Sequence, residues 1–233
     1  MERLIATVDL SDDDLAVADA DLAAINYYRQ FRRALLGERV FDLAVFDHPR
    51  EAPPGAGSGW RLFREADRAV YLQAMSEIVA ASMAKDQPSF RAAMSDIDGR
   101  VRKAFESPVA SWRYPIAKLL IPSAQMYADN LGRGTAKRDV ARTAIAAERF
   151  RLAKGRLPEG LNELVPGFLA KVPADPFAGG PLGWAVSGDD CRIYSVGPDG
   201  VDQGGGVQET ADGGDIVFRL PHRKAGKKST AAE

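Results

Sequence analysis

"ERFRLAKGRLPEGLNELVP", residues 148–166, is the stretch that decides the fold, because a long helical pattern ends inside it. Gly155 can adopt the left-handed conformation that terminates helices, and the prolines that follow cannot continue one. The sequence therefore predicts one long helix from Ile116 to Gly155. The segment LPEGLNELVPGFL, residues 157–169, predicts a short second helix bounded by prolines.

The long helix has two contrasting faces when its residues are spaced at about 100 degrees each. A small apolar face predicts packing against a core, and it carries Val140, Ala144, Ala147 and Phe150. A basic stripe predicts contact with solvent, and it carries Arg138, Arg142 and Arg149. Bends are expected at Pro122, Gly132 and Gly134.

Beyond the loop VPADPFAGGPLG the pattern changes to short strands. LGWAVS (182–187) and CRIYSV (191–196) flank GDD, which suits a hairpin connection. DIVFRL (215–220) predicts a third strand, antiparallel to the second. Since the apolar face of a small sheet has to be covered, we expect the long helix to cover it. The fold class predicted here is α+β, with a long helix packed on a small three-stranded antiparallel sheet.

The N-terminal half predicts helices. Ser11 followed by three aspartates is a capped helix start, and the pattern runs to Gly37. VFDLAVFD, residues 40–47, fits either a strand or a short helix, and the proline- and glycine-rich residues 48–60 predict a loop. Two further helices are expected at residues 61–84 and 89–105. The sequence thus divides into a helical domain (1–110), a second domain (111–222) and a disordered tail (223–233).

Composition restricts the classes of protein. The chain has 233 residues, of which 45% are hydrophobic and 27% charged, as in an ordinary globular protein. Its net charge of -1 gives no electrostatic argument for nucleic acid or an anionic membrane. The single cysteine, Cys191, excludes an internal disulfide. No apolar stretch reaches the roughly 18 residues of a membrane helix, so no membrane segment is predicted in this chain.

The loop between the second and third strands, GPDGVDQGGGVQETADGG (197–214), is rich in glycine and carboxylates and offers little that could pack. Two interpretations stay open. The loop is a mobile, solvated connection, or its acidic groups bind something that orders it in place of a core.

The order of these features resembles a known family. The helix end Phe150–Pro158, the short helix Leu161–Leu164, the loop Pro173–Phe177 and the turn Ser195–Gly200 follow one another with similar spacing in the G-type major pseudopilin of type II secretion. The resemblance covers residues 117–220, about half the chain. It implies a pseudopilin-like fold for this part. Phe177 stands where the family's loop has tryptophan.

The resemblance also implies a calcium site. In the family the acidic loop before the last strand binds calcium, which carries over to Asp199, Asp212 and Asp215, with main-chain carbonyls near Ser195 completing the shell. Calcium prefers six to eight hard oxygen ligands at flexible angles, and a glycine-rich loop can supply them. A shared ion predicts that the carboxylates of Asp199 and Asp215 approach one another.

The family's apolar anchor is replaced here by IAKLLIP (116–122), after about 110 residues of helical sequence. We therefore expect a pseudopilin G-like module fused to a helical domain, in a non-catalytic assembly or binding protein that acts on protein partners and not on nucleic acid. The strand-like RLIATVDL (3–10) has no partner nearby and predicts a missing upstream portion. If that portion holds a membrane segment, the module lies in the periplasm or cell envelope; otherwise it is cytoplasmic.

The competing class is a hydrolase-type enzyme with its site in the helical half. A cluster of carboxylates with raised pKa values in a helical pocket would favour it. The two histidines, His48 and His222, lack further ligands at zinc spacing, and Ser58 lies outside a Gly-x-Ser-x-Gly elbow. The residues therefore favour binding over catalysis.

Overall fold

The computed structural model describes residues 10–47, 61–84, 86–121, 123–187, 190–206 and 214–221. These residues form two compact units. The sheet unit consists of the described residues in 10–25 and 132–221, and the helical unit consists of those in 26–131.

The units are divided after Ile25 and after Leu131, whereas the sequence suggested a boundary at residues 110–111. The predicted single helix from Ile116 to Gly155 is two helices in the structure: α7 (Pro115–Leu120) ends before Ile121, whose backbone is extended, and α8 (Ala124–Lys154) begins after it. Helix α8 continues through the second division and through Gly132 and Gly134. Residues 3–9 of the strand-like start, the 48–60 loop and the 223–233 tail lie outside the described residues.

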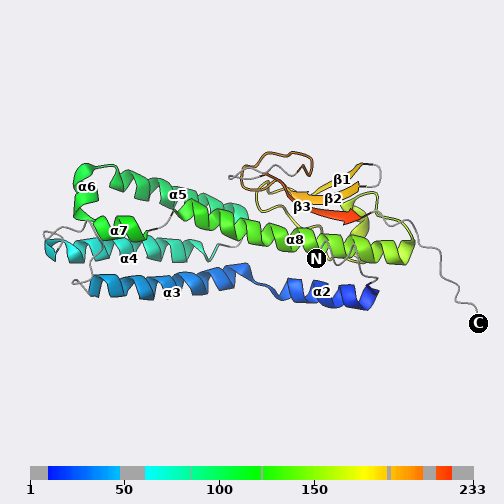
Figure 1. Cartoon of the computed structure of the whole chain (residues 1–233), viewed down its shortest axis with the longest axis horizontal. Coiled ribbons are helices and arrows are strands. Elements are labelled where there is room, and N and C mark those ends of the chain that lie inside the picture. The colour runs from blue at the N-terminus through cyan, green and yellow to red at the C-terminus, as the bar shows by residue number, and fades with distance from the viewer. Residues whose placement is uncertain are drawn as a thin grey trace, which may run out of the picture. The chain divides into compact units, whose positions relative to one another are not determined.

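The helical unit is built from a series of helices that surround an apolar core. They are α3 (Tyr27–Asp47), α4 (Arg64–Ala81), α5 (Gln87–Phe105), α6 (Pro108–Arg113), α7 (Pro115–Leu120) and the first turns of α8 (Figure 1). Large side chains on three of these helices fill the centre without contact with solvent, among them Tyr71, Met75, Phe90 and Met94. The segment VFDLAVFD, which fitted either a strand or a helix, is helical as the end of α3.

A buried carboxylate joins two of these helices. Asp67 on α4 accepts hydrogen bonds from the main-chain amides of Ile116 (3.1 Å) and Ala117 (2.8 Å) at the start of α7. The first amides of a helix have no partner within the helix, so Asp67 supplies the cap from another element. Its full burial is therefore balanced by hydrogen bonding.

The predicted continuous helix from Ser11 to Gly37 is wrong. The capping box at Ser11 is present and begins α2 (Asp12–Ala24), but Ile25 is extended and the chain starts again at α3. Asn26 causes this restart, because its side chain accepts from the amide of Arg29 (2.9 Å) and its carbonyl from that of Gln30. A strong cap inside a helical pattern begins a second helix.

The sheet unit confirms the predicted α+β arrangement. Helix α8 ends at Lys154 and is followed by Gly155, whose φ is 74°; a short 3-10 helix, η3 (Leu161–Leu164), comes next. The strands β1 (Gly183–Ser187), β2 (Asp190–Ser195) and β3 (Ile216–Pro221) form one antiparallel sheet in the order β1-β2-β3. Figure 1 shows this small sheet lying along α8.

One face of the sheet packs on the predicted apolar face of α8. Alternate residues of β2 and β3 point to this core, namely Cys191, Ile193, Phe218 and Leu220. They join Val140, Ala144, Ala147 and Phe150 of α8, all of which are buried. The opposite face carries Tyr194, whose ring covers the cross-strand partner Gly183 so closely that a Cβ there would collide with it.

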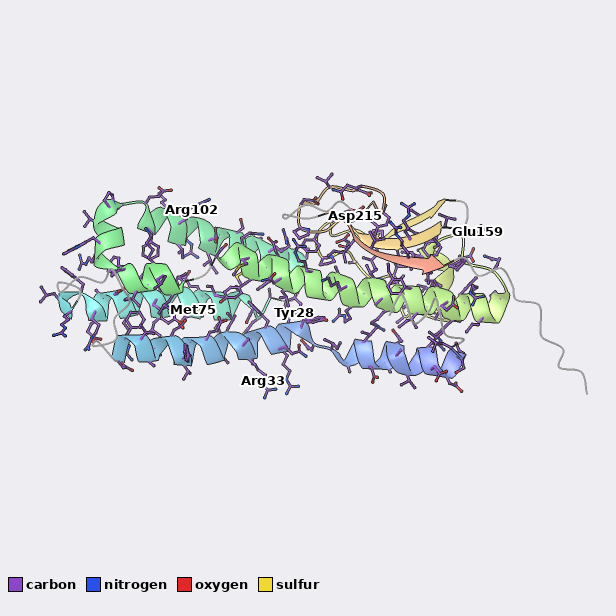
Figure 2. The ribbon with its side chains drawn as sticks, viewed as in Figure 1. Tyr28, Arg33, Met75, Arg102, Glu159 and Asp215 are labelled. Atoms are coloured by element: carbon purple, nitrogen blue, oxygen red, sulfur yellow. The ribbon has the colours of Figure 1, made fainter. Side chains whose placement is uncertain are left out.

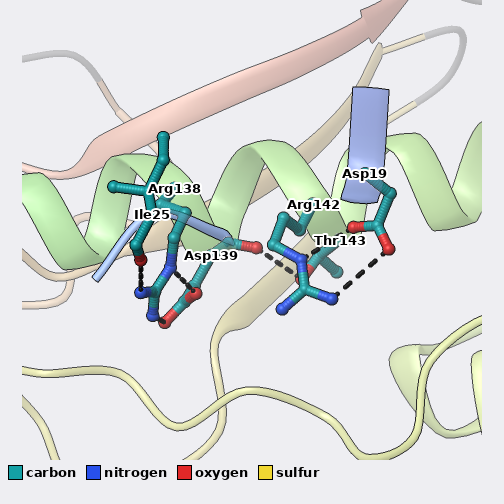
Figure 3. Close-up of polar contacts among 6 residues, drawn as sticks. All are labelled: Asp19, Ile25, Arg138, Asp139, Arg142 and Thr143. Carbon is teal, nitrogen blue, oxygen red and sulfur yellow. Dashed lines mark hydrogen bonds and ion pairs between the residues drawn. The ribbon is translucent and has the colours of Figure 1, made fainter. Parts of the chain in front are cut away.

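The basic stripe of α8 does not face solvent as predicted. Arg142 forms an ion pair with Asp19 of α2 (2.7 Å), and Arg149 forms one with Asp12 (2.7 Å). Arg138 donates to the carbonyl of Ile25 at 3.0 Å and pairs with Asp139 on its own helix (Figure 3). Helix α2 therefore runs antiparallel to α8 and covers the stripe, with Leu15 of α2 fully buried in the same core.

Candidate functional site

The loop before the sheet is organised by Asp175, whose carboxylate is buried. One carboxylate oxygen accepts from the amide of Phe177 (2.8 Å) and the hydroxyl of Ser195 (2.8 Å), and the other accepts from the amide of Val196 (2.8 Å). The main chain of Asp175 also pairs with Gly180 and Gly179. Asp175 therefore fixes the loop at residues 173–182 to the end of β2.

Ser195, expected near an ion, lies at this junction. Its side chain is fully buried, its hydroxyl donates to Asp175, and its oxygen accepts a long hydrogen bond from the amide of Gly197 (3.4 Å). The hydroxyl is thus engaged in holding the turn that starts the acidic loop. The predicted contribution near Ser195 was from main-chain carbonyls, and that part stays a prediction.

Asp199 and Asp215 are connected through Gln203. The amide of Gln203 donates to Asp215 (3.4 Å), while its side-chain nitrogen donates to Asp199 (3.1 Å). Asp215 also accepts from the amide of Gly205 (2.7 Å), and Asp199 from that of Val201 (3.1 Å). The two carboxylates therefore organise one loop from its two ends.

Gln203 also contributes an unsatisfied oxygen. Its side-chain Oε1 is buried and has no hydrogen-bond partner among the described residues. A buried acceptor without a donor carries an energetic cost of about 1–3 kcal/mol. This oxygen belongs to Gln203, which links the two acids through its side-chain nitrogen to Asp199 and its main-chain amide to Asp215, so a hard acceptor lies in the same loop.

Electrostatics within the loop are unfavourable for negative charge. Burial raises the pKa of the Asp215 carboxyl; the amides of Gly205 and Gln203 act in the opposite direction, and the nearby charges of Asp202 and Asp199 raise it again. Burial and a hydrogen bond to Asp202 raise the pKa of the Tyr194 hydroxyl. A positive charge placed among these carboxylates would therefore be stabilised.

Asp212, the remaining predicted ligand, lies outside the described residues. Within the described part of the chain, no group of three or more His, Cys, Asp or Glu side chains is arranged to hold a metal ion. Sequence reasoning placed Asp199 and Asp215 in one loop but missed Asp175, Asp202 and Gln203. An aspartate between two prolines was the available signal for Asp175; nothing in the pattern singled out Gln203.

Two hollows on the helical unit are lined by residues that the structure describes. One, of about 280 Å³, is lined by Val70, Gln73, Ala74, Glu77, Arg100, Val101 and Ala104. Its carboxylate, Glu77, is paired with Arg100 at 2.7 Å. The other, of about 320 Å³, is lined by Val101, Arg102, Phe105, Glu106, Lys118 and Ile121. Among the described residues, the lining of each hollow thus contains one carboxylate and not the pair of carboxylates that would act as general acid and base.

None of the helices in the described ranges combines the length and apolar composition needed to cross a bilayer. Comparison of the chain with family models, with curated proteins and with solved structures gave no match.

Proposed function

We propose that this chain is a non-catalytic assembly or binding protein of the cell envelope, whose sheet unit acts as a pseudopilin G-like module. The observation that carries the proposal is the order of elements after α8: η3, the Asp175 loop, the β1–β2 hairpin, the turn at Gly197–Gly200 and the returning β3. Each of these elements matches a feature on which the sequence resemblance rests.

The contacts of the buried acids support a structural role for this unit. Both carboxylate oxygens of Asp175 accept hydrogen bonds from main-chain amides or from the Ser195 hydroxyl, and Asp215 accepts from the amide of Gly205. These carboxylates therefore link parts of the chain that are distant in sequence. The acids of the sheet unit therefore serve to shape a surface that a protein partner can recognise.

We further propose that calcium is a structural ion of the loop between β2 and β3. The residues that would hold it are Asp199, Asp215 and Asp212, together with carbonyls near Ser195; Gln203 adds an unpartnered oxygen. These are hard oxygen donors of the kind that calcium prefers. Bound calcium would neutralise the repulsion that helps to raise the pKa of Asp215.

A thermal melt in EDTA and in millimolar calcium tests the ion. A ligand at about 100 times its dissociation constant adds roughly 2.7 kcal/mol to the folded state, which raises the melting midpoint by about 5–10 °C for a chain of this size. Asp199→Asn should abolish the increase. Asp21→Asn, at an exposed position on α2, is the matched control and should keep it.

The pH dependence of the calcium effect provides a second criterion. Burial raises the pKa of Asp215 above the ordinary carboxyl range. As the pH falls, protons therefore begin to compete with calcium for this carboxylate at a pH above that range. The calcium-induced increase should therefore be full near neutral pH and should shrink as the pH falls into that range. Identical melts with and without calcium at neutral pH would remove the ion from the proposal.

The assembly role is tested separately by binding. Purified chain is titrated against the soluble domains of the type II secretion pseudopilins of the same cell, and the envelope fraction is probed for the chain. Micromolar or tighter binding to one of these domains is expected, as for specific protein interfaces. Absence of both binding and envelope association would overturn the assembly role whatever the calcium result.

A further inference from the structure

The α6–α7 segment of the helical unit exposes large apolar side chains. Val109 and Trp112 on α6 are 69% and 64% exposed, and Leu119 on α7 is 65% exposed. Leu62, which precedes α4, is 84% exposed. Single exposed apolar residues are normal, but several in one short region form a patch that calls for an explanation. We call residues 102–119, together with Leu62 and Phe63, the tip.

Ring contacts show that part of the tip is one continuous surface. Trp112 packs edge-on against Phe63, with ring centroids 5.3 Å apart. The Arg113 guanidinium lies 5.2 Å from the Phe63 ring centre and 5.5 Å from that of Tyr114. An exposed tryptophan is thus held by a second aromatic ring and accompanied by a cation. Figure 1 shows α6 at one end of the helical unit.

The tip is also locally basic, although the whole chain is nearly neutral. Residues 102–119 carry four basic side chains, Arg102, Lys103, Arg113 and Lys118, against the single acid Glu106. Arg102 and Lys118 line the 320 Å³ hollow together with one carboxylate, Glu106, and the apolar Val101, Phe105 and Ile121. Arg102 is labelled on α5 in Figure 2. The lining of the hollow therefore combines two cations and one acid, a net positive charge, with apolar side chains.

These features together identify the kind of partner. Tryptophan and short aliphatic side chains beside arginine and lysine are the composition of segments that lie in the interface of a bilayer. Anionic headgroups complement the four cations, and acyl chains accept the apolar side chains. Lysine is depleted at the centre of protein interfaces, and the phosphate contacts that dominate nucleic-acid binding give the exposed valine and leucine no role.

We infer that the tip docks on the surface of an anionic phospholipid bilayer. Val109 and Trp112 enter the boundary between headgroups and acyl chains, while Arg102, Arg113 and Lys118 meet lipid phosphates. This docking is peripheral and needs no membrane-spanning helix. It concerns the helical unit alone and stands independently of the role proposed for the sheet unit.

Vesicle co-sedimentation of the full chain tests the inference. Vesicles of phosphatidylcholine alone are compared with vesicles in which about a third of the lipid is phosphatidylglycerol, at low and at high salt. Binding is expected to the anionic vesicles and to weaken at high salt. Each cation near an anionic surface contributes about a fivefold gain in affinity, so Arg102→Gln/Lys118→Gln should bind about 25-fold more weakly.

Matched variants separate docking from simple charge. Arg32→Gln/Arg33→Gln removes the same charge from exposed positions of α3, and Val17→Ser removes an exposed apolar side chain from α2. Trp112→Ser should weaken binding at least as much as loss of one cation, whereas Val17→Ser should not. Circular dichroism verifies that every variant is folded.

The inference fails on any of three results. The first is equal binding to neutral and anionic vesicles, or binding to neither. The second is equal weakening by the tip pair and by the α3 pair, which would indicate attraction by overall charge. The third is unchanged binding of Trp112→Ser.

Discussion

At the scale of single residues, the described part of the loop between β2 and β3 is shaped by carboxylates that accept hydrogen bonds from main-chain amides and by glycines with positive φ. Gly197, Gly200, Gly204 and Gly205 all have φ between 67° and 77°. Each allows the chain to reverse within a few residues, and Asp199, Asp202 and Asp215 then accept the amides that the turns expose. Residues 197–206, the part of the polar loop that the structure describes before Gly214, are thus held by local hydrogen bonds.

Two of these glycines differ in their surroundings, which gives a residue-scale prediction. A Cβ at Gly197 would collide with the main-chain carbonyl oxygen of Gly214, whereas a Cβ at Gly200 would meet open space. Both substitutions to alanine incur the cost of a left-handed residue, about 1 kcal/mol. Gly197→Ala should therefore reduce the free energy of unfolding by about 2–4 kcal/mol and Gly200→Ala by about 1 kcal/mol.

Chemical denaturation of the two variants and the parent protein measures the difference. Gly200→Ala serves as the control, because it places a side chain on a residue with positive φ in the same turn but causes no collision. Equal losses for the two variants would show that the contact between Gly197 and Gly214 does not constrain the loop.

At the scale of elements, helix α2 is attached to α8 by pairs with matching spacing. Asp12 and Asp19 are seven residues apart, as are Arg142 and Arg149, so antiparallel helices bring both pairs together. Seven residues make nearly two helical turns, which keeps each set on one face. Leu15 lies between the two acidic positions in the sequence and is fully buried.

A double-mutant cycle on Arg142 and Asp19 measures one of these pairs. Their side chains are 27% and 22% exposed, and the guanidinium donates to both carboxylate oxygens. We expect a coupling of about 1 kcal/mol from Arg142→Gln and Asp19→Asn in urea unfolding. Arg149 and Asp12 form the comparison pair, which should couple less because Asp12 is 54% exposed.

The pH dependence of the second pair has a definite sign. A hydrogen bond from Arg149 lowers the pKa of Asp12, so this contribution is present above the ordinary carboxyl range and is lost as the pH falls through the lowered pKa. A cycle on Arg142 and Asp19 with no coupling at low salt would show that this ion pair does not help to hold α2 on α8.

Periodicity predicted most elements but not how they associate. The end of α8 at Gly155, the three strands and the apolar face of α8 followed from glycine, proline and spacing. The break at Asn26 was missed because the apolar spacing of a helix continues across this residue, and that pattern was given more weight than the capping side chain of Asn26. The arginines of the stripe have the same spacing whether they face solvent or pair with carboxylates. Only the contact with α2, which lies more than 100 residues earlier in the chain, distinguishes the two cases.

The same limit applied to the candidate site. Glycines and acids indicated that residues 197–215 form a special loop, but the link from Asp175 to Ser195 spans 20 residues and a hairpin. Gln203 looks unremarkable in the sequence, and only its position between Asp199 and Asp215 gives it a role. Long-range contacts of this kind depend on the fold and have no periodic signal.

At the scale of the whole molecule, the chain is divided into units that do not follow its order. Residues 10–25 belong with the C-terminal part and residues 26–131 form the other unit, so the chain enters the sheet unit twice. Each unit has its own cluster of buried apolar side chains, with Leu15 in the one and Met94 in the other. Helix α8 contributes residues to both clusters.

Reciprocal core substitutions test this division by hydrogen exchange. Leu15 and Met94 are both fully buried, and truncating such a side chain to alanine costs about 2–5 kcal/mol. Because amide exchange reports local opening, Leu15→Ala should accelerate exchange about 30-fold or more in β1–β3 and in α8 after Leu131, and leave α4 and α5 protected. Met94→Ala should do the reverse, with the change in α8 confined to residues 124–131. If either substitution accelerated exchange equally along the entire chain, the two clusters would open as one cooperative core. The stability of α2 would then depend on the whole molecule and not on the sheet unit alone.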